Sequence, residues 1–172
     1  FKMKNTSAKY RLEKLNQMKK LILEKKDEIS LALSQDFHKP KVETELTEIM
    51  PTVSMINLLE KQLPSWMADE KVKTPLLFKG SKSWIRREGK GCSLVISPWN
   101  YPFQLSLTPL IGAVGSGNTV IIKPSELAPN TSSVLNKLIC NVFPQNLVSV
   151  VEGDAETAKY LLDKKWDYIL FT

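Results

Sequence analysis

A rigid side-chain amide is the first group in this sequence that could do chemistry. Asn100 stands inside the run Ser97–Pro102, which reads S-P-W-N-Y-P, so prolines on both sides restrict its backbone. A fixed amide with few charges nearby suits the stabilisation of a developing oxyanion, because its N–H is already oriented and little water competes. The alternative is a turn asparagine bonded to its own backbone, and the spacing alone favours that alternative.

A cation and a carboxylate three residues apart form the second candidate. Lys123 and Glu126 belong to the tetrapeptide K-P-S-E, which follows an apolar run. Together they could offer a donor and an acceptor to a polyol such as a ribose. They could equally pair with each other, which is worth only about 0.2–0.5 kcal/mol on a helix. Spacing alone favours the local ion pair.

Three glycines raise the question of a phosphate-binding loop. Gly112, Gly115 and Gly117 are spaced G-x-x-G-x-G, whereas a dinucleotide loop reads G-x-G-x-x-G, follows a strand and opens a helix. Here the segment closes a helical stretch. We therefore predict that Gly115 and Gly117 terminate a helix.

These residues need elements that position them, and from Gly91 onward the sequence alternates short apolar runs with helical stretches. We expect strands at 93–97, 119–122, 147–151 and 168–171, and helices at 104–114, 130–142 and 155–162. This order predicts a Rossmann-like α/β fold: a parallel sheet with flanking helices on both faces and right-handed crossovers. Ligands in such folds bind beyond the carboxyl ends of the strands, where both candidates lie.

Two helical patterns precede the sheet and are expected to cover it. Apolar residues recurring at three, four or seven predict an amphipathic helix from about 5 to 37, with Thr6 or Ser7 as its cap. A second helical pattern contains Pro51, which either kinks that helix or starts a new one. The apolar positions of the second pattern are Val42, Leu46, Ile49, Val53, Ile56 and Leu59.

Short alternating runs around Gly80, between 69 and 91, predict a two-stranded excursion. An exposed pair of strands would need a partner strand from another domain or subunit to satisfy its backbone.

Charge and hydropathy argue against two classes of protein. Of the net charge of +6, residues 1–30 hold +5, from nine basic and four acidic residues. Their alternation with apolar positions favours a solvated helix face, so we do not expect nucleic acid as a partner. The charge-free run Gly91–Ile122 is 32 residues long, but Pro98, Pro102 and Pro109 interrupt it. It predicts a protein interior and no membrane segment.

Cysteine usage and the N-terminal residues predict a cytoplasmic location. Cys92 and Cys140 lie in or beside apolar runs without C-x-x-C spacing, which predicts buried free thiols in a reducing compartment. The basic N-terminus lacks the apolar segment and the small-residue cleavage site of a signal peptide.

The motifs taken together resemble a known family. V-I-S-P-W-N-Y-P at 95–102, G-N-T-V-I-I-K-P-S-E at 117–126 and the final F-T are similar to the N-terminal half of the NAD(P)-dependent aldehyde dehydrogenases. The helical pair and P-S-W-M at 64–67 are most similar to the shorter, usually dimeric class three members. The resemblance covers nearly the whole chain. It implies N-terminal helices at 1–68, a bridging or oligomerising β excursion at 69–90, and the first part of the NAD(P)-binding domain at 91–172.

The resemblance also implies a role for each matching residue. Asn100 would donate its amide to the thiohemiacetal oxyanion, which replaces the turn-asparagine interpretation. Lys123 and Glu126 would hold the adenosine ribose. Glu126 favours NAD over NADP, because a carboxylate accepts from a free 2′-OH and repels a 2′-phosphate, although class three relatives often use both. The other cofactor-binding residues implied are Ile96, Ser97, Pro98, Trp99, Pro124 and Ser125.

The family's reaction oxidises an aldehyde to a carboxylic acid with NAD(P)+. A cysteine thiolate attacks the carbonyl, hydride leaves to the nicotinamide, and a glutamate-activated water hydrolyses the thioester. In the family this cysteine and glutamate follow a turn that would come after Thr172. We therefore predict the N-terminal cofactor-binding portion of a homodimeric aldehyde dehydrogenase, inactive by itself. The alternative is a truncated, non-catalytic paralogue that binds a nucleotide or pairs with a full-length subunit.

Overall fold

A four-stranded parallel sheet forms the centre of the computed structural model, which describes residues 3–172. The strands lie in the order β5-β4-β3-β6. Their bounds are β3 Cys92–Ile96, β4 Thr119–Lys123, β5 Val148–Val150 and β6 Tyr168–Phe171. The helices that connect them are α5 (Pro102–Gly115), α6 (Pro129–Val142) and α7 (Ala155–Leu162). The predicted β-α-β order and parallel pairing are confirmed. The bounds of α7 and β6 are the ranges predicted from the sequence.

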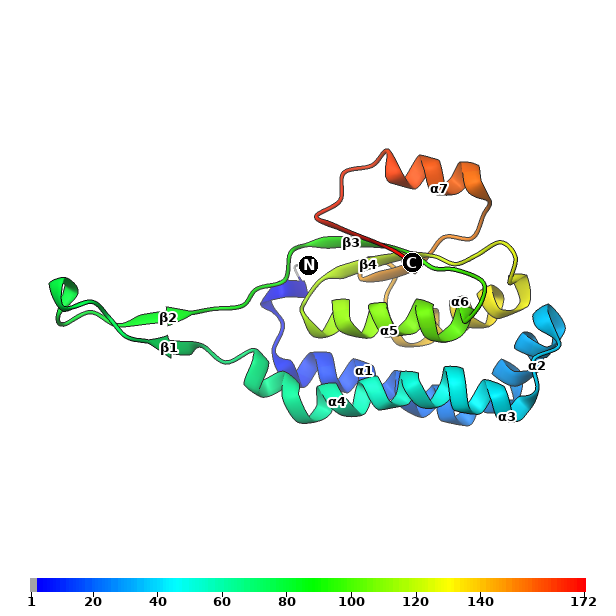
Figure 1. The fold of residues 1–172 in the computed structure, drawn as a ribbon, viewed down its shortest axis with the longest axis horizontal. Coiled ribbons are helices and arrows are strands. Elements are labelled where there is room, and N and C mark those ends of the chain that lie inside the picture. Colours follow the sequence, from blue (N-terminus) through cyan, green and yellow to red (C-terminus); the bar gives the residue numbers. More distant parts are fainter. Residues whose placement is uncertain (1–2) are drawn as a thin grey trace.

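Helices cover both faces of this sheet. Figure 1 shows α5 and α6 on one side of the strands and α7 on the other. Successive side chains of a strand point to opposite faces, so Val95 of β3 joins the larger core while Leu94 and Ile96 join a small cluster with Leu161 of α7. The central strands β3 and β4 are therefore covered on both faces, which is why they contain continuous apolar runs, whereas the edge strand β6 is largely exposed.

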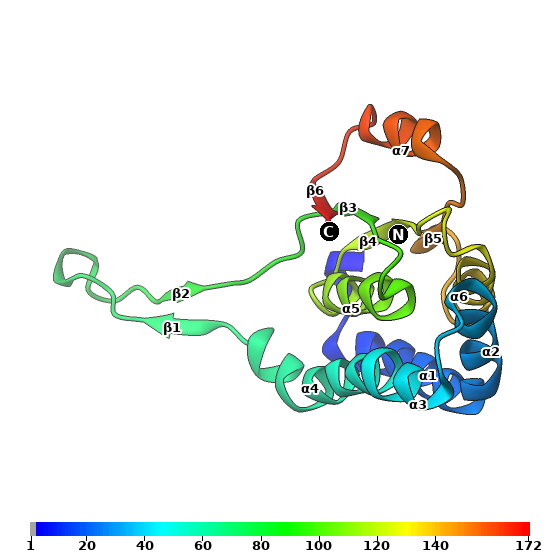
Figure 2. The same cartoon turned by 45° about the vertical axis from the view of Figure 1, so that its right-hand side comes forward.

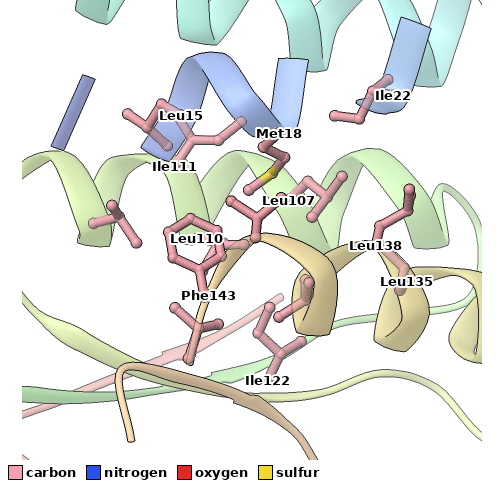
Figure 3. Packing of buried hydrophobic residues seen from close by; sticks show 14 of the residues in the cluster. Leu15, Met18, Ile22, Leu107, Leu110, Ile111, Ile122, Leu135, Leu138 and Phe143 are labelled. Atoms are coloured by element: carbon pink, nitrogen blue, oxygen red, sulfur yellow. The ribbon is translucent and has the colours of Figure 1, made fainter. Parts of the chain in front are cut away.

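The helix α5 lies between the sheet and an outer helical layer. Figure 3 shows Leu15 and Met18 of α1 (Ala8–Glu24) packed against Leu107 and Ile111 of α5, with Ile122 of β4 on the far side. All five side chains are at most 1% exposed. A helix enclosed in this way is apolar all round, which accounts for much of the charge-free run.

The first predicted helix is present as two. Ser7 caps α1, its Oγ accepting from the backbone N–H of Tyr10 at 3.3 Å, so the predicted cap is confirmed. The chain then bends at Lys25 (φ −103°, ψ 17°) and continues as α2 (Lys26–Phe37). α1 packs on α4, α5 and α6, whereas α2 packs mainly on α6 and α3. The bend therefore gives the two helices different sets of neighbours.

The second predicted helix is also divided, and two of its expected core positions are wrong. A short helix α3 (Lys41–Thr44) leads into a π-helical turn at Glu45–Ile49 and then into α4 (Met50–Trp66). Pro51 stands in the first turn of α4, so it starts a helix. A π turn takes in an extra residue and rotates the chain that precedes it. Val42 and Leu46 consequently point to solvent, 69% and 58% exposed.

The predicted two-stranded excursion is confirmed as an arm that extends away from the body (Figures 1 and 2). Its strands β1 (Glu70–Val72) and β2 (Ser83–Ile85) pair antiparallel. Ion pairs of 2.6 Å join Asp69 to Arg86 and Glu70 to Arg87 where the arm meets the body. Within residues 3–172, no helix has the length and apolar character needed to cross a membrane.

Candidate functional site at the carboxyl edge of the sheet

The sheet register brings the two candidate motifs to one edge. In the parallel pair β3·β4, Ile96 lies opposite Lys123, so both strands end at the same level. The turn that carries Asn100 follows Ile96, and the tetrapeptide K-P-S-E begins at Lys123. On the other side of β3, Phe171 of β6 also lies opposite Ile96. The structure thus places the predicted groups together at the carboxyl ends of the strands.

The Asn100 side chain is exposed at this edge. Within residues 3–172 its amide makes no hydrogen bond, so it is not a turn asparagine bonded to its own backbone. Its backbone carbonyl accepts from Lys39 Nζ at 3.3 Å. The side-chain amide of Asn100 therefore faces solvent, while Lys39 holds the backbone that carries it.

A buried ion pair supports the turn, and the sequence analysis missed it. Lys39 and Glu48 pair through Nζ and Oε1, with side chains only 7% and 0% exposed. Glu48 Oε2 also accepts from the backbone N–H groups of Phe103 (2.9 Å) and Gln104 (3.2 Å), at the start of α5. The capping position of α5 is Tyr101, which supplies no side-chain acceptor. A helix whose capping residue offers no acceptor needs one from elsewhere in the fold. The lack of a capping side chain at Tyr101 is therefore the one sequence feature that could have indicated a distant acceptor such as Glu48.

Lys123 and Glu126 form the local ion pair that their spacing allowed. Lys123 Nζ lies 2.5 Å from Glu126 Oε2; the lysine side chain is 4% exposed and the glutamate side chain 45%. The hydrogen bond from Lys123 is the main reason why the pKa of Glu126 is lowered, with a backbone N–H adding to it. Glu126 is therefore an ionised acceptor at the surface, anchored by a buried cation.

The remaining predicted cofactor residues divide into buried and exposed. Ile96 and Ser97 are buried, and Ser97 Oγ lies 2.7 Å from Ser106 Oγ on the α5 side. Pro124 and Ser125 are buried as well. Pro98 is half-buried and Trp99 is 53% exposed, with its ring centroid 6.2 Å from that of Phe37. Of these side chains, only those of Pro98 and Trp99 reach the surface.

A cavity of about 610 Å³ lies elsewhere, beside α5 and β6. Its lining includes Val95, Thr108, Gly112 and Leu170, and none of the predicted site residues. The candidate site is thus an open sheet edge. The groups present there are a buried ammonium and an exposed amide, which can donate hydrogen bonds to hydroxyl and carbonyl oxygens, and an exposed carboxylate, which can accept them from hydroxyl groups.

The cysteines and glycines have structural positions. Cys92 is the half-buried first residue of β3, at the amino end of the strand, and Cys140 is exposed on α6. The prediction that both thiols are buried is wrong, because Cys140 follows the buried Leu138 and Ile139 and turns outward on the helix. The helix-terminating role of Gly117 is confirmed: it has φ +86° and its N–H donates to Val114 O at 3.0 Å.

Comparisons with known proteins agree on one family. The model of the aldehyde dehydrogenase family matches residues 1–172. The 4,4'-diaponeurosporen-aldehyde dehydrogenase of Staphylococcus aureus is 43% identical over 95% of this chain and 36% of the relative. The chloroplastic aldehyde dehydrogenase family 3 member I1 of Arabidopsis thaliana is 44% identical over 96% of this chain and 30% of the relative. This chain thus spans about a third of the length of these curated relatives.

Solved structures show the same fold. The substrate-bound state of Staphylococcus aureus AldH superposes with a TM-score of 0.92 at 42% identity, over 96% of this chain and 36% of that chain. A glyceraldehyde-3-phosphate dehydrogenase, GapN, from Methanocaldococcus jannaschii complexed with NADP gives a TM-score of 0.83 at 25% identity, over 98% and 37%. The family model covers the whole chain and the family 3 relatives are similar over nearly all of it, so this chain belongs to the aldehyde dehydrogenase family.

Proposed function

We propose that this chain forms the cofactor-binding portion of an NAD(P)-dependent aldehyde dehydrogenase, an oxidoreductase that converts an aldehyde to a carboxylic acid. Family membership supports the reaction class. One observation carries the assignment to these residues: the register that pairs Ile96 with Lys123 brings the Asn100 amide and the Lys123–Glu126 pair to one sheet edge. That edge is where ligands of such sheets bind.

In this proposal Asn100 acts on the oxygen of the aldehyde. Its exposed amide lies in a proline-bracketed turn and has no hydrogen-bond partner in residues 3–172, so its N–H donors are free to bind an oxygen that gains negative charge. An amide already aimed at that oxygen need not reorganise when the charge develops.

Lys123 and Glu126 are proposed to hold the adenosine ribose of the dinucleotide. The buried ammonium fixes a carboxylate that stays ionised, since the pKa of Glu126 is lowered by Lys123, and an ionised carboxylate accepts from ribose hydroxyls. A bound nicotinamide dinucleotide supplies the hydride acceptor for the oxidation. We propose NAD as the preferred cofactor because Glu126 would repel a 2′-phosphate. Since the similar Methanocaldococcus enzyme was solved with NADP, the affinities for NAD+ and NADP+ should be measured side by side.

The half-buried Pro98 and the exposed Trp99 are proposed to line the cofactor cleft directly. Ile96, Ser97, Pro124 and Ser125 would shape the cleft through their backbone, since their side chains are buried.

The arm is proposed to bridge two subunits of a homodimer. Residues 69–90 would separate the helical segment 1–68 from the nucleotide-binding segment 91–172. Two observations support this role: the arm extends away from the body (Figure 2), and its tip exposes Leu76, Leu77 and Phe78 by 60% or more. We also propose a cytoplasmic location, which two free cysteines support.

The chain by itself is proposed to be inactive. Neither Cys92, at the amino end of β3, nor Cys140, on α6, lies at the carboxyl edge that holds Asn100. These residues therefore supply no nucleophile next to the oxyanion donor. Reduction of NAD+ with an aldehyde by the purified 172-residue chain would contradict this proposal.

The test combines turnover and nucleotide binding in the full-length enzyme that carries these residues. Asn100→Ala should lower kcat about 10²- to 10³-fold, as the loss of one oxyanion donor does, and leave the Kd for NAD+ unchanged. Glu126→Ala should weaken NAD+ binding roughly 10-fold or more in calorimetry, because a charged hydrogen bond is lost.

A matched control uses a second ion pair of the same spacing. Glu156 and Lys159 lie 2.6 Å apart on α7 and are both well exposed, so Glu156→Ala should leave binding and turnover unchanged. Unchanged kcat in Asn100→Ala, or equal effects of Glu126→Ala and Glu156→Ala on binding, would contradict the proposal. Firm NAD+ binding by the 172-residue chain alone, abolished by Lys123→Ala and by Glu126→Ala, would favour the truncated, non-catalytic paralogue instead.

A further inference from the structure

The buried ion pair beneath the Asn100 turn has no role in the proposed chemistry so far. Lys39 follows His38, the residue that caps the end of α2, and Glu48 lies on the π turn that precedes α4. Removing two charges from water is costly, and a buried pair recovers that cost only when further hydrogen bonds satisfy it. Both side chains make such bonds. Within residues 3–172, the side-chain hydrogen bonds of Lys39 and Glu48 go to each other or to the backbone between Asn100 and Gln104.

Lys39 holds the turn at Asn100 itself. Its Nζ donates to the backbone carbonyl of Asn100 at 3.3 Å and lies 4.5 Å from the centre of the Tyr101 ring. The direction of a carbonyl fixes the peptide plane that follows it. The ammonium therefore restrains the backbone from which the Asn100 side chain projects.

Glu48 holds the other end of the turn. Its Oε2 accepts from the N–H groups of Phe103 and Gln104, which are among the unpaired donors of the first turn of α5. A carboxylate at this position is also favoured by the positive end of the helix. Because Oε1 pairs with Lys39, one carboxylate links the start of α5 to the ammonium that holds Asn100.

We propose that Lys39 and Glu48 are positioning residues, which hold the Asn100 amide in the orientation that binds the substrate oxyanion. The inference rests on the proposed function of Asn100. It predicts that the pair affects the rate of the chemical step through Asn100 and leaves substrate and cofactor binding nearly unchanged.

The test is a double-mutant cycle in the full-length enzyme. Glu48→Gln keeps the volume but puts an N–H donor where either Lys39 or the helix N–H groups need an acceptor. It should lower kcat about 10- to 100-fold, since small misplacements of a catalytic group have effects of this size. The KM for the aldehyde and the Kd for NAD+ should change less than about three-fold. In the Asn100→Ala background, Glu48→Gln should change kcat less than about two-fold, because no amide is left to misorient.

A matched control and a second measurement separate positioning from folding. Glu60→Gln makes the same substitution in the pair that Glu60 forms with Lys19 at 2.7 Å, far from the turn in sequence, and should leave kcat unchanged. Hydrogen exchange, measured without cofactor, should become faster at the Phe103 and Gln104 amides in Glu48→Gln and not in Glu60→Gln.

Each contrary result has a different meaning. If kcat of Asn100→Ala is unchanged, the proposed function is wrong and the inference falls with it. If Asn100→Ala is impaired while Glu48→Gln is not, or if Glu48→Gln lowers kcat equally in both backgrounds, only the positioning role is wrong. Should Glu48→Gln fail to fold, Lys39→Met serves in its place, and Lys39→Arg, which keeps a cationic donor, should restore most of the lost kcat.

Discussion

Replacing Gly117 by alanine tests how the end of α5 is built. Gly117 has φ +86°, and a Cβ there would lie 2.6 Å from Nη2 and 2.7 Å from Cζ of Arg11. Arg11 is itself only 3% exposed. An alanine must therefore adopt the left-handed conformation and also displace a buried guanidinium.

The size of the effect follows from these two costs. A left-handed backbone costs a non-glycine residue roughly 1–2 kcal/mol. The Arg11 guanidinium donates to Gly115 O and Thr6 Oγ1, both at 2.9 Å. A hydrogen bond to a charged group is worth about 1.5–3 kcal/mol, so the loss of one such bond plus the strain lowers the free energy of unfolding by about 2.5–5 kcal/mol.

The assay is equilibrium unfolding in urea, followed by circular dichroism and tryptophan fluorescence. Gly80→Ala is the matched control, because Gly80 has φ +102° but a Cβ added there would meet nothing within 4 Å. It should lose only the backbone strain, about 1–2 kcal/mol. Equal losses in the two variants would refute the reasoning. A Gly117→Ala variant of unchanged stability that had lost nucleotide binding would indicate a phosphate loop instead.

Two other substitutions test contacts that support the same edge and its helices. Glu126→Gln removes the ion pair with Lys123. The pKa of Glu126 is lower in the folded than in the unfolded protein, so the pair stabilises the fold above the ordinary pKa of a glutamate. This stabilisation disappears as the pH falls through the pKa that Glu126 has in the folded protein. Urea unfolding should therefore show a wild-type advantage of under about 1 kcal/mol at neutral pH and none in strong acid. Asp36→Ala removes the acceptor of the first two backbone N–H groups after Pro129 on α6 and should lower the free energy of unfolding by about 1–2 kcal/mol. Asp27→Ala, which removes a fully exposed ion pair, should have a clearly smaller effect, and equal losses would contradict the capping role.

The sheet and the location of the site were predictable from local sequence. Strands buried on both faces are continuously apolar, so β3 and β4 are visible as short apolar runs between helices. The edge strand β6 is also a short apolar run, although most of its side chains are exposed. Parallel strands joined by helices all end at one edge, so the Asn100 turn and Lys123 had to meet there.

The outer helices were predicted less well, because their course depends on what they pack against. Nothing local distinguishes Lys25, where the first helix bends, from the other lysines of that segment. The π turn at 45–49 likewise changes which residues face the core, so Val42 and Leu46 are exposed despite their spacing. Apolar periodicity assumes a regular helix and fails where the helix is irregular.

The sequence by itself determined which groups this protein offers to a ligand: an amide fixed between prolines, and a lysine and a glutamate three residues apart. Only the tertiary structure decided how the turn that carries the Asn100 amide is held. Lys39 is 61 residues from Asn100 and Glu48 is 55 residues from Phe103, and their contacts arise where the segment after α2 and the π turn meet the start of α5. Spacing along the chain cannot reveal such a pair, because a buried charge finds its partner through the packing of helices.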